Sequence, residues 1–154
     1  MKKRPALTPE EIEALAKLTR ALGENPRDRG SLSSAFSQIV AGKGDLVFKA
    51  LFDAQRGPDG DEASAIASTM SLLEAMMDTS PGVGGYLMGR LYPIARRRYF
   101  HHTCDAIELW MDASRSDELA DSLSKLANEG CGPDLQATYE AWAAHIRNSR
   151  KRTE

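Results

Sequence analysis

The chain has 154 residues, of which 42% are hydrophobic and 27% charged, and its formal net charge is −2. This size suits one domain with a buried core, and the bias toward Ala, Leu, Glu, Lys and Arg favours helices because these side chains lose little rotamer freedom in them. Charge is balanced, with ten basic and eleven acidic residues on each side of Met77. Bulk charge therefore gives no argument for binding nucleic acid or a membrane surface.

The cysteines and the first residues bear on location. Only Cys104 and Cys131 occur, without a Cys-x-x-Cys motif, which argues against a disulfide framework and a zinc ribbon. Residues 1–4 carry the charge of a signal-peptide start, but Pro5 and the acidic stretch 10–13 stand where an apolar region would have to follow. No apolar run approaches the length of a bilayer span. We therefore expect a cytoplasmic protein with reduced thiols.

Start and stop signals predict the first two helices. A capping box at 8–11 predicts a helix over 8–23, attached through a polar connector, 24–30. Such a connector would let this helix swing or pack on a partner. Ser31 is then expected to cap a short helix that ends at Gly42 and carries the apolar stripe Leu32, Ala35, Phe36, Ile39 and Val40.

Turn signals separate the next helices. Residues 46–55 are apolar nearly all round, which indicates a central, buried helix. The Gly-Pro-Asp-Gly turn at 57–60 precedes a helix over 61–78 whose apolar positions are Ile66, Met70, Leu73 and Met77. Another helix begins at 80–82, and Pro93 is expected to break or kink it because the proline ring clashes inside a helix.

The last third of the chain continues the same pattern. A helix is expected over 94–113, further helices begin at Asp117 and Pro133, and a basic tail follows at 147–154. The short connections favour antiparallel helical hairpins. We therefore expect one all-α domain over 1–154, a compact irregular bundle or array of about seven to eight helices.

One segment departs from ordinary helical composition. Residues 79–104 form 26 positions without a carboxylate, and they hold four of the ten aromatic residues. Arginine supplies planar donors for carboxylate or phosphate, and aromatic rings cover area at low entropic cost. We therefore expect the Arg/Tyr-rich segment 86–102 to bind a partner through Arg90, Tyr92, Arg96, Arg97, Arg98 and His101.

A solvated helix face would explain the same composition. If 94–113 is one helix, its polar arc holds Arg97, Arg98, His101 and Asp105, and such an arc needs no partner. Arg96 alone falls on the apolar arc. A guanidinium there requires a partner, because an unpaired buried charge is strongly destabilising.

The remaining motifs favour structure over chemistry. Gly85 and Gly89 indicate close helix packing or a hinge, since neither a preceding strand nor a Gly-Lys-Ser/Thr sequence makes them a phosphate loop. His101 and Asp105 would need a third metal ligand from elsewhere because Cys104 projects toward the core, so neither a metal nor a cofactor is expected. No activated nucleophile or carboxylate pair in a dry pocket is visible, and no enzymatic activity is expected.

By exclusion, the sequence favours a non-catalytic protein-binding module, an adaptor or inhibitor with an acidic partner. Small bacterial helical proteins such as toxin-neutralising immunity and anti-defence proteins are similar in general character, by analogy and not by motif. The alternative is association with nucleic acid through the same segment and residues 147–152. A pI of about 6.0 and the absence of a nucleic-acid-reading motif weigh against it. Self-association stays open, and no membrane attachment is expected.

Overall fold

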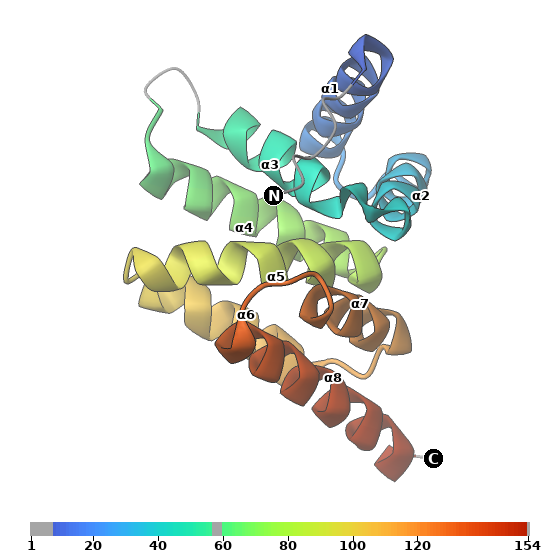
Figure 1. Cartoon of the computed structure of the whole chain (residues 1–154), viewed down its shortest axis with the longest axis vertical. Coiled ribbons are helices and arrows are strands. Elements are labelled where there is room, and N and C mark those ends of the chain that lie inside the picture. The colour runs from blue at the N-terminus through green and yellow to red at the C-terminus, as the bar shows by residue number, and fades with distance from the viewer. Residues whose placement is uncertain (1–7, 57–59, 154) are drawn as a thin grey trace.

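The computed structural model describes the backbone of residues 8–56 and 60–153, and the side chains of these ranges as far as Ser149. Within them the chain forms helices and no strand (Figure 1), which confirms the all-α prediction. None of the described helices is both long and apolar enough to cross a bilayer. The helices are α1 (Pro9–Glu24), α2 (Arg29–Gln38), α3 (Gly44–Gln55), α4 (Glu62–Met77), α5 (Pro81–Arg97), α6 (His101–Ala113), α7 (Asp117–Ala127) and α8 (Pro133–Thr153).

Side-chain caps fix where the first helices begin. Thr8 accepts a hydrogen bond from the Glu11 backbone N–H at 3.1 Å, as the capping box predicts. The prediction for α2 was wrong, because Asp28 and not Ser31 is its cap. The Asp28 carboxylate accepts the Gly30 N–H at 3.1 Å and the Ser31 hydroxyl at 3.0 Å. α2 therefore begins inside the stretch expected to be a connector.

α1 packs on its own domain. It continues past the predicted end at Gly23, so that only residues 25–28 separate it from α2. Its buried residues are Leu15, Leu18 and Leu22, and it contacts both α2 and α3. Lys43 also pairs with Glu11 at 2.8 Å. The expected long connector is thus a short turn, which holds α1 against the fold.

A wide turn, Ile39–Lys43, joins α2 to α3. Gly42 has a φ of 84° there, a left-handed conformation that glycine adopts without a steric penalty. Two members of the predicted apolar stripe face solvent: Phe36, within α2, is 39% exposed, and Val40, beyond the end of α2 at Gln38, is 58% exposed. Of the predicted turn at 57–60, residues 57–59 lie outside the described part of the chain.

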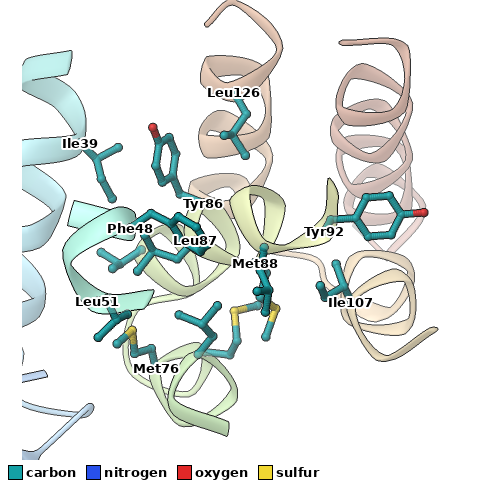
Figure 2. Close-up of a cluster of buried hydrophobic side chains, with 14 of the residues drawn as sticks. Ile39, Phe48, Leu51, Met76, Tyr86, Leu87, Met88, Tyr92, Ile107 and Leu126 are labelled. Carbon is teal, nitrogen blue, oxygen red and sulfur yellow. The ribbon is translucent and has the colours of Figure 1, made fainter. Parts of the chain in front are cut away.

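The central helix is α5 and not the predicted 46–55 helix. α5 contacts α2, α3, α4, α6 and α7, and every residue from 82 to 89 is buried. Figure 2 shows Tyr86, Leu87, Met88 and Tyr92 pointing to different sides of α5. Four of the residues 82–89 are glycines, and a residue without a side chain gives no hydrophobic pattern from which burial can be predicted.

Glycines bring α5 close to α7. A Cβ atom on Gly85 would overlap Leu119 Cδ1, and one on Gly89 would overlap Leu126 Cδ1. Ser122 adds a buried hydrogen bond of 2.8 Å to the Gly82 carbonyl. Of the two predicted roles for Gly85 and Gly89, close packing between helices is the one that the structure shows.

Gly85→Ala is expected to lower the free energy of unfolding by about 1–3 kcal/mol, the usual effect of overpacking a filled core, because Leu119 is fully buried. Gly23→Ala is the matched control, since its Cβ would meet nothing within 4 Å and should stabilise α1 by roughly 0.5–1 kcal/mol. Urea denaturation measures both variants. If Gly85→Ala were as well tolerated as Gly23→Ala, the close contact between α5 and α7 would be wrong.

The sequence predicted a break or a kink at Pro93, and the break is wrong, because α5 runs through this residue. Proline lacks the N–H that would bond to the carbonyl four residues earlier, here that of Gly89. Tyr139 of α8 supplies the missing donor, because its buried hydroxyl donates to the Gly89 carbonyl oxygen at 2.5 Å. Gly89 also leaves room for the Tyr139 ring, which an added Cβ would approach to 3.4 Å. A donor 50 positions away in the sequence therefore lets the helix continue to Arg97.

Tyr139→Phe is expected to destabilise the fold by about 1–3 kcal/mol, because it leaves the buried Gly89 carbonyl without its side-chain donor. In a Pro93→Ala background the restored backbone N–H can bond to that carbonyl, and the same substitution should cost clearly less. Urea denaturation of the four proteins gives the coupling energy. Equal costs in both backgrounds would show that the Tyr139 hydroxyl does not compensate for the N–H that Pro93 lacks.

Candidate functional site

The turn between α5 and α6 has an unusual backbone. The Tyr99 N–H donates to the Arg96 carbonyl at 3.1 Å and the Phe100 N–H to the Ala95 carbonyl at 2.9 Å. These two bonds form a Schellman motif, which places Tyr99 at the position where helices usually have glycine. Tyr99 accordingly has a φ of 60°, the only positive φ of a non-glycine residue in the described chain.

The Tyr99 side chain gains little from its own fold. It is 79% exposed, and its ring centroid lies 6.5 Å from that of His101. A left-handed backbone costs an L-residue about 1–2 kcal/mol relative to the right-handed one. A strained residue whose side chain projects into solvent is a reasonable candidate for contact with another molecule.

Two of the predicted contact residues are bonded within the fold: Arg90 has a side chain that is only 27% exposed, and Tyr92 is buried. Arg90 forms an ion pair with Glu129, and Tyr86 donates a hydrogen bond to the same carboxylate at 2.7 Å. Tyr92 is 7% exposed and donates to Glu108 at 3.2 Å. Burial, reinforced by the Glu108 carboxylate, raises the pKa of Tyr92 to about 12. Arg90 and Tyr92 therefore stabilise the interior and offer a partner little surface.

Arg98 is neutralised within the fold. Its guanidinium donates to Glu62 of α4 at 2.7 Å, and this hydrogen bond lowers the pKa of the Glu62 carboxyl. The pair links the α5–α6 turn to the first turn of α4. Arg98 is thus a tether for this turn rather than a free cation.

Arg96 and Arg97 end α5 on the surface. The prediction that Arg96 falls among apolar residues was wrong, because it assumed one helix over 94–113, whereas the chain turns at Arg98–Phe100 and α6 begins only at His101. Arg96 is exposed and lies over the Tyr92 ring, 5.6 Å from its centroid. Arg97 is exposed as well and forms no ion pair with any described residue.

We call the exposed basic and aromatic residues of this turn the α5–α6 tip: Arg96, Arg97, Tyr99, His101 and His102. Two hollows flank it. One, of about 450 Å³, lies between the end of α5 and the start of α8 and is lined in part by Arg96, Arg97 and Asp134. The other, of about 580 Å³, lies toward the start of α4 and includes Arg98 and Phe100. The tip offers cations and a rigid ring between two depressions, which suits docking of an acidic surface.

The described residues form no cluster of metal ligands, and Cys104 is a buried thiol. They contain no group of three His, Cys, Asp or Glu side chains that could hold a metal ion. Cys104 is buried, as its predicted direction toward the core requires. Burial raises the pKa of its thiol, which favours the unreactive protonated form.

The predicted basic tail is part of α8. This helix continues to Thr153, and Arg147 pairs with Asp121 of α7 at 2.9 Å. The expectation of a tail beyond the last contact was therefore wrong for Arg147. Residues 134 and 147 are also about 20 Å apart along a helix that rises 1.5 Å per residue, so Arg147 lies far from the tip.

Tyr99→Gly is expected to raise the free energy of unfolding by about 1 kcal/mol, because glycine adopts a positive φ without strain. Tyr99→Ala keeps a Cβ and should bring no such gain. Thermal or urea denaturation distinguishes the two variants. A Tyr99→Gly protein no more stable than Tyr99→Ala would show that the backbone here is unstrained.

Comparisons of the chain with protein-family models, curated proteins and solved structures found no match. The geometry adds Tyr99 to the residues predicted from the sequence, and it separates the exposed Arg96, Arg97 and His101 from the internally bonded Arg90, Tyr92 and Arg98. The only sequence signal for Tyr99 was its place within the run Arg-Arg-Arg-Tyr-Phe-His-His at 96–102.

Proposed function

We propose that this protein is a non-catalytic binding module, an adaptor or inhibitor, that docks an acidic partner protein through the α5–α6 tip. The observation that carries the proposal is Tyr99, an exposed ring held in a left-handed backbone between basic residues. Glycine would be the more stable choice at this position. A residue that lowers stability without packing inside its own fold is best explained by a contact outside it.

The tip has the residue types that dominate protein interfaces. Tyrosine and arginine are enriched among residues whose truncation costs the most binding energy. The backbone bonds of the Schellman motif and the Arg98–Glu62 pair hold the turn in place before binding. A preorganised contact surface loses less conformational entropy on association, which supports Tyr99 as an anchor and Arg97 as its charged neighbour.

The charge of the tip favours an acidic partner. No carboxylate occurs between Asp78 and Asp105. Of the carboxylates that other elements bring to this segment, Glu129 is bonded to Arg90 and Glu62 to Arg98, while Asp134 lines the hollow beside Arg97 without forming an ion pair with it. Arg97 therefore keeps an unneutralised guanidinium for carboxylates of a partner. Both cysteines are free thiols, which supports action in a reducing, cytoplasmic environment.

Nucleic acid is the weaker candidate for the same surface. It would draw on residues 147–152, yet Arg147 is bonded to Asp121 and lies about 20 Å along α8 from the residues near the tip. These contacts favour a protein partner, similar in kind to those of bacterial inhibitor or adaptor proteins.

The test is capture of a stoichiometric protein partner from native extract with the tagged chain, followed by titration with purified variants. Arg97→Glu and Tyr99→Ala are each expected to weaken binding at least about tenfold, the effect of losing one contact worth 1.4 kcal/mol or more. Arg115→Glu and Leu109→Ala, at exposed positions away from the tip, are matched controls that should leave affinity unchanged.

Three results would overturn the proposal: no partner, a partner that binds the tip variants as well as the controls, or a captured complex that nuclease treatment disperses. The third is checked with mixed DNA and RNA, whose binding would fall by orders of magnitude between about 50 and 200 mM salt if several phosphates were neutralised. Arg98→Glu is unsuitable as a test because it would place two carboxylates together at Glu62.

A further inference from the structure

A second surface lies between α1 and α3. A groove of about 840 Å³ runs between these helices, and its apolar lining includes Ile12, which is 56% exposed. The lining residues form rows along both walls: Ile12, Leu15, Ala16, Thr19, Arg20 and Gly23 on α1, and Leu46, Lys49, Ala50, Asp53, Ala54 and Gln55 on α3. This surface does not depend on the proposed function of the α5–α6 tip.

The dimensions of the groove fit a helix. The α1 wall extends from Ile12 to Gly23, which corresponds to about 16 Å at 1.5 Å per residue, or three turns. Small residues stand on both walls, among them Ala16 on α1 and Ala50 and Ala54 on α3. Small side chains let a third helix approach α1 and α3 closely. Apolar residues at positions i, i+3, i+4 and i+7 of that helix would contact the lining residues along both walls.

The rim of the groove is positively charged. Arg20 stands on the α1 wall and Lys49 on the α3 wall, both are exposed, and neither forms an ion pair with a described residue. The one acidic group in the lining, Asp53, is paired with Arg56 at 3.3 Å. A bound helix with carboxylates on both flanks would meet a cation on each side.

We infer that this groove binds an acidic amphipathic helix of a partner protein. A second copy of this chain fits less well, because facing grooves would bring Arg20 and Lys49 of both copies together. The site is also separate from the tip: in Figure 1, α1 stands at the upper right and the α5–α6 turn at the left edge. The protein thus has two docking surfaces at different ends of the fold.

The test is selection from two displayed libraries of helical peptides about three turns long, both with a randomised apolar stripe. One library has glutamates and the other lysines on the flanks. The full chain is expected to enrich peptides from the glutamate library alone. Fluorescence anisotropy with an enriched peptide should show at least tenfold weaker binding to Arg20→Glu/Lys49→Glu, and to Ala16→Trp, which fills the groove from an exposed position.

The matched controls are Arg115→Glu and Ala67→Trp, both at exposed positions outside the groove, and Tyr99→Ala for the tip. All three should bind the peptide as the unchanged protein does. The inference is wrong if neither library is enriched, if lysine-flanked peptides bind equally well, or if Ala16→Trp has no effect. A dimer in sedimentation velocity that Ala16→Trp dissociates would also overturn it, by assigning the groove to a second copy.

Discussion

The hydrogen bond from the Tyr139 hydroxyl to the Gly89 carbonyl allows the central helix, α5, to continue past Pro93. Without it, Pro93 would leave the buried Gly89 carbonyl oxygen without a donor. An unsatisfied buried acceptor destabilises the fold enough to favour a helix that ends before the proline. With it, α5 continues for four residues beyond Pro93 and carries Arg96 and Arg97 to the surface. The position and direction of the α5–α6 tip therefore depend on one contact from α8.

The rest of α5 packs closely against its neighbouring helices, and glycines make this possible. Its glycines admit Leu119 and Leu126 of α7, and on the other side Gly44 of α3 packs against the Tyr86 hydroxyl. Tyr86 and Arg90 share the Glu129 carboxylate, so the polar groups within this tight packing have partners. Contacts with α3, α7 and α8 hold α5 in place. The turn at the end of α5 is therefore fixed as well, and so is the backbone of the exposed Tyr99.

The sequence was informative wherever the signal was local. The cap at Thr8, the start of α8 at Pro133 and the buried positions of α4 all follow from residues a few places apart, because capping and helical periodicity involve neighbours within one or two turns. The break expected at Pro93 was wrong because the donor that replaces its missing N–H, Tyr139, lies 50 positions from the Gly89 carbonyl that it serves. That error placed the helix break five residues too early and assigned Arg96 to the apolar face of the following helix.

The candidate site could likewise be predicted only in part, because its composition is visible in the sequence and its contacts are not. The acid-free segment and its arginines could be found from composition, but the pairing of Arg90 with Glu129 and of Arg98 with Glu62 is a tertiary property. The strain at Tyr99 is also invisible in the sequence, since tyrosine gives no hint of a positive φ.

The strain at Tyr99 is a substantial part of the stability of the fold. A domain of this kind has a total stability of about 5–15 kcal/mol, and the left-handed backbone at one turn lowers it by about 1–2 kcal/mol. It is tolerated here because the two backbone bonds of the turn and the Arg98–Glu62 tether hold the chain in a conformation that the side chain of Tyr99 by itself disfavours.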